Sequence, residues 1–149
     1  MPVFGCANEA DIPALSQLLS VLFTQEAEFK PNAQAQKNGL SMIIGNPDLG
    51  TILVAREGPC ILAMVNLLFS ASTVLGARVA IIEDMIVSQN ARGIGIGSGL
   101  INHAIEFAKD SGAKRVTLLT DKDNHSAHRF YAKNGFTQST MLTFRRSLE

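Results

Sequence analysis

A glycine-rich segment in the second half of the chain has the composition of an anion-binding loop. It consists of Arg92, Gly93, Ile94, Gly95, Ile96, Gly97 and Ser98. Glycine lets the backbone approach a ligand closely, and the free N–H groups at the start of a following helix favour phosphate. Arg92 adds a positive charge at the mouth of the loop. The segment is therefore a candidate site for the phosphates of a nucleotide-type cofactor.

Three interpretations of this loop compete. A triphosphate-binding P-loop requires Lys followed by Ser or Thr after its last glycine, whereas Ser98 and Gly99 stand here. A dinucleotide site requires the spacing GxGxxG, whereas the glycines from Gly95 onward give only GxGxG. A glycine-rich turn can also do no more than ease the packing of a helix on a strand. The loop alone does not decide between a phosphate site and a turn that only eases packing.

The neighbouring segments predict a strand before the loop and a helix after it. Apolar runs at 79–82 and 85–87 flank Glu83 and Asp84, which is typical of a strand covered on both faces. After the loop, apolar residues recur at helical spacing, and the helix is expected to end at Gly112. These are Leu100, Ile101, Ala104, Ile105 and Ala108.

A second strand and helix follow. The run 116–121 is apolar enough for a buried strand, and 124–136 is typical of a helix that begins at Asn124 as N-cap and ends at a glycine.

The two segments together resemble the GCN5-related N-acetyltransferase (GNAT) family. That family pairs an Arg/Gln-x-x-Gly-x-Gly loop after a central strand with a downstream helix of pattern Asn-x-x-Ala-x-x-Phe-Tyr-x-x-x-Gly-Phe. Arg92, Gly95 and Gly97 match the first half. The second half is matched by Asn124, Ala127, Phe130, Tyr131, Gly135 and Phe136. The resemblance extends, more loosely, over essentially the whole chain.

This resemblance implies transfer of an acetyl group from acetyl-coenzyme A to a primary amine by direct attack in a ternary complex. It places the pantetheine arm beside the central strand, with a main-chain N–H near Ile86 and Val87 facing the thioester oxygen. Tyr131 then stands at the family position of the acid that protonates the departing thiolate. Cofactor contacts are expected from Ile86, Val87, the loop 92–98, Asn124, Ala127, Phe130 and Tyr131.

The base that deprotonates the amine is expected among the strand carboxylates, acting directly or through water, with a chain of water molecules as the open alternative. Glu83 and Asp84 are neighbours on one strand, so only one of them can face a given cleft. In relatives with an acidic residue at this place, that carboxylate is often assigned the base, and Glu83 is favoured here. A structural carboxylate bonded to a neighbouring loop is the alternative, and it is preferred for Asp84.

Composition and residue spacing argue against several other classes of protein. The chain has 149 residues, 46% of them hydrophobic, and a formal net charge of zero, so no basic surface points to nucleic acid. Two cysteines lack metal-ligand spacing, no apolar run reaches the ~20 residues of a membrane helix, and no export signal is recognised. His125 and His128 have no third ligand with recognisable spacing, so no metal is expected. We expect a cytoplasmic protein.

The remaining periodicities complete one expected domain, 1–149. Strands are expected at 2–6, 51–56 and 61–69, and helices from about 12 to 22 and 33 to 44. The order of strands and helices predicts an α/β (α+β) fold with a mixed, mostly antiparallel central sheet and helices on both faces. This is also the order of the GNAT-like acyl-CoA N-acyltransferase fold.

The sequence leaves alternatives open for the strands of the C-terminal segment and for the identity of the acceptor amine. Residues 137–146 are expected to form one bent strand or two short ones broken near Ser139, and an unpaired sheet edge there would favour a homodimer. Glu26 and Glu28 could attract a cationic amine, although a solvated helix end is the preferred interpretation. Peptide, lysine, polyamine, aminoglycoside and amino acid acceptors all stay open. The alternative function is a catalytically silent acyl-CoA-binding sensor.

Overall fold

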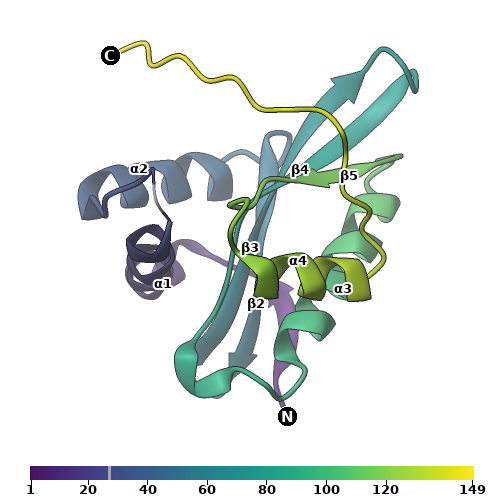
Figure 1. Cartoon of the computed structure of the whole chain (residues 1–149). Helices are drawn as coiled ribbons and strands as arrows, with labels where there is room; N and C mark the ends of the chain where they lie inside the picture. The colour runs from purple at the N-terminus through teal and green to yellow at the C-terminus, as the bar shows by residue number, and fades with distance from the viewer. Residues whose placement is uncertain (27) are drawn as a thin grey trace.

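A computed structural model describes residues 1–26 and 28–149 (Figure 1). The strands are β1 Val3–Cys6, β2 Gly50–Glu57, β3 Cys60–Ser72, β4 Ala77–Val87 and β5 Val116–Leu118. The helices are α1 Ile12–Gln25, α2 Ala33–Ile44, α3 Ile96–Asp110 and α4 His125–Lys133, with short 3-10 turns η1 Glu9–Asp11 and η2 Gln89–Ala91.

The strands form one sheet in the order β1-β2-β3-β4-β5. The first four strands are antiparallel to their neighbours, and β5 runs parallel to β4. The connection from β4 through α3 to β5 is the crossover that a parallel pair requires. The predicted mixed, mostly antiparallel sheet is therefore confirmed.

Helices cover both faces of this sheet (Figure 1). On one face, α1 and α2 bury a core that includes Leu15, Leu40 and Met64. On the other face, α3 buries a core that includes Leu100 and Val65, and α4 packs at its margin. Neighbouring residues Met64 and Val65 thus serve opposite cores, as the alternation of a strand requires. No helix among residues 1–26 and 28–149 is long and apolar enough to span a bilayer.

A β-bulge interrupts the alternation of β4. Asn66 pairs with Asp84 and Leu67 pairs with Ile82, so Glu83 is the extra residue on β4. Ile82 consequently belongs to the α3 face, whereas Asp84, two residues later, reaches Asn66 and the pocket beside α1 and α2. Strict alternation would place Asp84 on the same face as Ile82. The bulge at Glu83 instead brings Asp84 to the face covered by α1 and α2.

Local signals explain the helix boundaries. The side chain of Asn32 accepts a hydrogen bond from the N–H of Ala35 and begins α2, which ends at Gly45 as C-cap. Asn8 and Asp11 form a capping box around η1. The prediction of a helix over 33–44 agrees with the structure at both ends.

The prediction of strands in 137–146 is wrong for this structure. The segment after α4 runs as an extended trace away from the helix and forms no strand among the described residues (Figure 1). A strand requires a neighbouring strand to pair its backbone groups. The neighbour at this edge of the sheet, β5, is only three residues long rather than the six expected, so it offers little backbone for a further strand to pair with. Arg145 touches the rest of the chain through an ion pair with Glu28 and a contact over the ring of Phe29. The homodimer stays a prediction.

Candidate active site

The site lies where β4 and β5 separate. The two strands pair only at Ala80–Ile82 with Val116–Leu118. Beyond Ile82, β4 continues to Val87, and within the described part of the chain no strand lies beside that stretch on the β5 side. On that side the backbone near Ile86 and Val87 therefore has no strand partner among the described residues, and this break in the pairing is called the gap below.

The glycine-rich loop leads from the end of β4 to the start of α3. Gly93 and Gly95 have φ angles of 82° and 87°, which L-residues with side chains rarely adopt. The first hydrogen bond of the helix joins the N–H of Gly99 to the carbonyl of Gly95. The N–H groups of the three residues before Gly99 therefore have no partner within the helix, and the loop has the free donors that a phosphate requires.

Not every predicted loop residue can use its side chain. Ile96 is buried in the core, so only its backbone can reach a ligand. A Cβ at Gly97 would lie 3.3 Å from the ring of Phe130, so this glycine also allows α4 to pack on α3. Arg92 is exposed, and its Nε donates to the carbonyl of Val87 at 2.9 Å, which leaves the outer guanidinium nitrogens for an anion.

The α4 helix borders the same loop. Asn124 caps it by accepting from the N–H of Ala127 at 3.2 Å. At its other end, Asn134 donates from Nδ2 to the hydroxyl of Ser98 at 3.3 Å and to the carbonyl of Phe130 at 2.9 Å. The start of α3 and the end of α4 are thereby held together. The sequence motif did not assign this role to Asn134.

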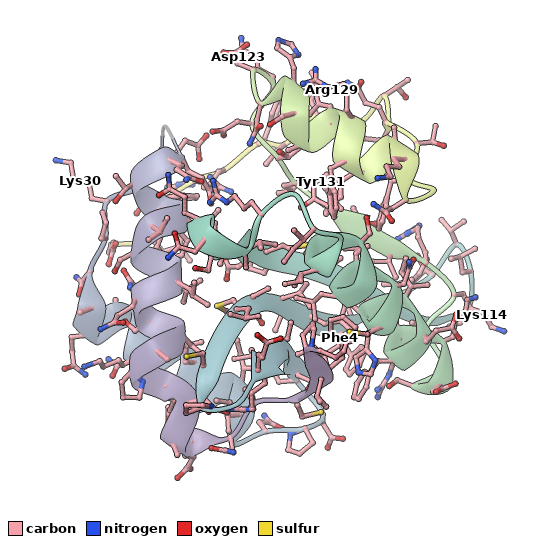
Figure 2. All side chains as sticks on the ribbon, turned by 90° about the horizontal axis from the view of Figure 1, so that it is seen from below. Phe4, Lys30, Lys114, Asp123, Arg129 and Tyr131 are labelled. Carbon is pink, nitrogen blue, oxygen red and sulfur yellow. The ribbon has the colours of Figure 1, made fainter. Side chains whose placement is uncertain are left out.

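Tyr131 lies on the face of α4 that is turned toward the rest of the chain (Figure 2). Its ring packs edge-to-face on Phe130 at 5.2 Å and on Phe136 at 5.7 Å between centroids. Burial raises the pKa of the Tyr131 hydroxyl to about 12, and the carboxylate of Glu26 adds to the increase. The hydroxyl is therefore protonated at neutral pH and available as a hydrogen-bond donor.

The two carboxylates of β4 have different surroundings. Asp84 is partly buried and accepts from the Nδ2 of Asn66 at 3.0 Å. Burial raises the pKa of Asp84, the hydrogen bond from Asn66 opposes this shift, and the charge of Glu83 adds to it. Glu83, in the bulge, is exposed.

Glu26 joins this acidic group from the end of α1. It is the C-cap of the helix and is half-buried. Burial raises the pKa of Glu26 to about 7, and the charges of Asp84, Asp121, Glu83 and Glu28 contribute in decreasing order. Carboxylates from β4 and from the segment after β5 thus act on Glu26, and Glu26 in turn acts on the Tyr131 hydroxyl.

Sequence reasoning underrated Glu26 and did not consider Asn66. Glu26 was assigned to a solvated helix end, because three of the carboxylates that surround it, Glu83, Asp84 and Asp121, are more than fifty residues away in the chain. Asn66 is an ordinary polar residue inside an apolar strand. A buried amide in such a run is the one signal that pointed to it, since buried polar groups require partners.

Comparison with known proteins agrees with the fold and the motifs. The model of the Acetyltransferase (GNAT) family matches residues 12–136. The uncharacterized N-acetyltransferase YhfO of Bacillus subtilis (strain 168) is 31% identical over 125 residues, which cover 82% of this chain and 83% of YhfO. The aminoalkylphosphonate N-acetyltransferase of Salmonella typhimurium (strain LT2) is 28% identical over 133 residues, covering 89% of this chain and 83% of the relative.

A solved structure extends the similarity to the whole fold. The crystal structure of a possible acetyltransferase from Clostridium difficile 630 superposes with a TM-score of 0.89 and covers 100% of this chain and 99% of the other. The two sequences are 15% identical, so this likeness concerns the fold alone.

Proposed function

The chain belongs to the GNAT family of acetyltransferases, and from this we propose that it acts as one domain that moves the acetyl group of acetyl-CoA to a primary amine. Direct attack of the amine in a ternary complex is the proposed route. The observation that carries the proposal is that the gap beside β4 and the free N–H groups before Gly99 adjoin α4, which bears Tyr131 and packs on the start of α3 through Phe130 and Asn134.

Acetyl-CoA fits the residues that surround the gap. The N–H groups at the start of α3, with Arg92 beside them, suit the pyrophosphate. The unpaired stretch of β4 up to Val87 offers backbone groups to the amides of the pantetheine arm, as an added strand would be bound. The Asn124 side chain, at the start of α4, is placed to add a contact. The cosubstrate supplies an activated acetyl thioester.

The main chain of β4 stabilises charge on the thioester oxygen. When an amine attacks a thioester, the carbonyl oxygen becomes negative, and a fixed donor beside it lowers the barrier. The N–H groups near Ile86 and Val87 lie at the open stretch of the strand. We assign them this role.

Tyr131 assists the departure of the thiolate. A pKa of about 12 keeps its hydroxyl protonated across the working range of pH. Full proton transfer to a thiolate, whose conjugate acid has a pKa of ~8.5, would be uphill. The hydroxyl therefore acts as a hydrogen-bond donor that stabilises the charge developing on the sulfur, and the released thiolate takes its proton from solvent.

A carboxylate accepts the proton of the amine. Glu83 is the candidate that the family resemblance favours, and it is exposed at the bulge. Glu26, with a pKa of about 7, is better matched to a base working near neutral pH. We place the role on Glu26, with Glu83 as the second candidate, because the β4 carboxylates contribute to the raised pKa of Glu26 and its own charge acts on Tyr131.

The test is release of free CoA thiol from acetyl-CoA across a panel of primary amines. The panel includes an aminoalkylphosphonate, since a relative is named for that substrate, together with polyamines, aminoglycosides, amino acids and lysine peptides. Thiol release that requires an amine, with the acetyl group recovered on its nitrogen, supports the proposal. Tight CoA binding without turnover for every amine would favour the silent sensor instead.

A further inference from the structure

A pocket of about 180 Å³ lies between α1, α2 and the central strands. Its walls are mostly apolar side chains of the two helices, and its polar groups come from Gln36, Asn66 and Asp84. The amide of Gln36 is satisfied, because it donates to Ser16 and Ser20 and accepts from the N–H of Asn32. The unmet polar capacity of the pocket therefore lies with Asn66 and Asp84.

Asn66 presents a buried oxygen without a donor. Its side chain is 4% exposed, and its Oδ1 is the one buried side-chain polar atom among the described residues that has no hydrogen-bond partner. The carboxylate of Asp84 accepts from Nδ2, which fixes the orientation of the amide and leaves Oδ1 as the free acceptor. A buried acceptor without a donor is costly, so this atom indicates that a ligand group belongs beside it.

The polar end of this pocket carries negative charge. Asp84 lines the pocket beside Asn66, and the charges of Glu26 and Glu83 interact with that of Asp84. The ion pairs among the described residues join other groups, so Glu26, Glu83 and Asp84 have no cationic partner within that part of the chain. Neither Lys nor Arg lines the pocket. The missing ligand group is consequently a donor with a positive charge.

We propose that this pocket receives a second ammonium group of the acceptor, so that the enzyme acts on small aliphatic diamines in preference to monoamines. The inference rests on the proposed function and specifies its substrate class. The volume equals roughly six water molecules, which suits a short methylene chain with one terminal ammonium. The methylenes contact the apolar walls, and the ammonium donates to Asn66 Oδ1 and to Asp84. The other amine reaches the acetyl group beside Tyr131.

Wild-type kinetics with matched acceptors test this preference. Putrescine, butylamine, the corresponding amino alcohol and aminopropylphosphonate differ in the group at the remote end. We expect kcat/KM for putrescine to exceed that for butylamine roughly ten- to a hundredfold, as for a hydrogen bond to a charged group. The amino alcohol should fall between them, and the phosphonate should be the poorest acceptor because its charge has the wrong sign.

Gly39 allows the pocket to be filled without touching its polar atoms. This residue of α2 lines the pocket, and a Cβ there would meet no atom within 4 Å. Gly39→Leu should remove the preference for putrescine, while the KM for acetyl-CoA stays unchanged. Gly39→Ala is the matched control, since it makes a similar gain in helix propensity with little added volume. Circular dichroism and CoA binding establish that both variants fold.

Two results would overturn the proposal. One is equal kcat/KM for putrescine and butylamine in the wild-type enzyme, and the other is an undiminished preference in folded Gly39→Leu. If no amine is acetylated, the proposed function fails, but calorimetry with the CoA-loaded protein still decides about the pocket. Putrescine binding that Gly39→Leu abolishes would support the diamine site, and equally weak binding of putrescine and butylamine would refute it.

Discussion

The two sides of β4 are built from different parts of the chain. On the side of β5, the groups suited to the cofactor are mainly backbone N–H groups, positioned by Gly93, Gly95 and the start of α3. On the side of α1 and α2, the groups suited to the acceptor are side chains, notably Glu26, Asn66 and Asp84. The first set comes from one continuous segment, whereas the second comes from three separate elements.

This difference explains why the sequences of the cofactor side and the acceptor side of β4 can change independently of each other. A loop whose function depends on backbone donors tolerates few changes of glycine, because a positive φ strains other residues. Side chains in a pocket can be exchanged while the fold is kept. The cofactor side is thus suited to remain constant within the family, and the acceptor side is suited to select the amine.

Loss of the Tyr131 hydroxyl should have the largest effect. Phenylalanine keeps the ring packing on Phe130 and Phe136 but removes the donor. We expect Tyr131→Phe to lower kcat by roughly 10- to 10³-fold, with little change in acetyl-CoA binding, because the hydrogen bond strengthens only as the thiolate forms. Single-turnover kinetics provide the measurement. A wild-type chemical step in the variant would leave Tyr131 as a packing residue.

Glu26→Gln should remove a pH dependence from the acceptor side. In the wild type, the carboxyl with a pKa of about 7 is protonated below that pH and can act as a base above it. We expect kcat/KM to rise through pH 7, and the variant to lack this rise and to be slower on the order of 10²-fold at pH 8. Glu83→Gln is the comparison. Loss of the pH 7 limb in that variant alone would assign the base to Glu83.

A charge at the loop should weaken the cofactor side more modestly. Ile94 is 72% exposed and lies between the two glycines of positive φ, so its side chain can be changed without altering the packing. Ile94→Glu should weaken CoA binding about tenfold in low salt, with a smaller difference at high salt, because screening reduces the repulsion. Calorimetry with CoA, carried out at low and at high salt, measures the affinity under both conditions. Ile94→Lys, the control, should bind at least as tightly as the wild type.

The smallest expected effect concerns stability. The pKa of Glu26 is raised from 4.5 to about 7 in the folded state, so its ionised form is disfavoured there. The resulting loss of stability develops as pH rises from 4.5 to 7 and is constant above. Glu26→Gln should therefore raise the melting temperature at pH 8 by a few degrees and leave it unchanged at pH 4. A larger gain at pH 4 than at pH 8 would contradict this assignment of charge.

Sequence reasoning succeeded where the information is local. The helix over 33–44, the strands at 51–56 and 61–69 and the loop before α3 follow from caps, turns and periodicity, and the family follows from two spaced motifs. The sequence offered Glu26 as a residue that could attract a cationic amine but favoured a solvated helix end, because the grouping of Glu26 with Glu83 and Asp84 depends on the β-bulge at Glu83 and on where α1 ends. The strands expected after Phe136 failed because a strand depends on a partner that local pattern does not reveal.

Two-substrate kinetics of Ile94→Glu and Gly39→Leu, measured side by side, test most directly whether the two sides of β4 hold different substrates. Ile94→Glu should raise the KM for acetyl-CoA and leave that for the amine unchanged. Gly39→Leu should raise the KM for the amine and leave that for acetyl-CoA unchanged. If either folded variant raised both KM values equally, the separation of a backbone-built cofactor side from a side-chain-built acceptor side would be wrong.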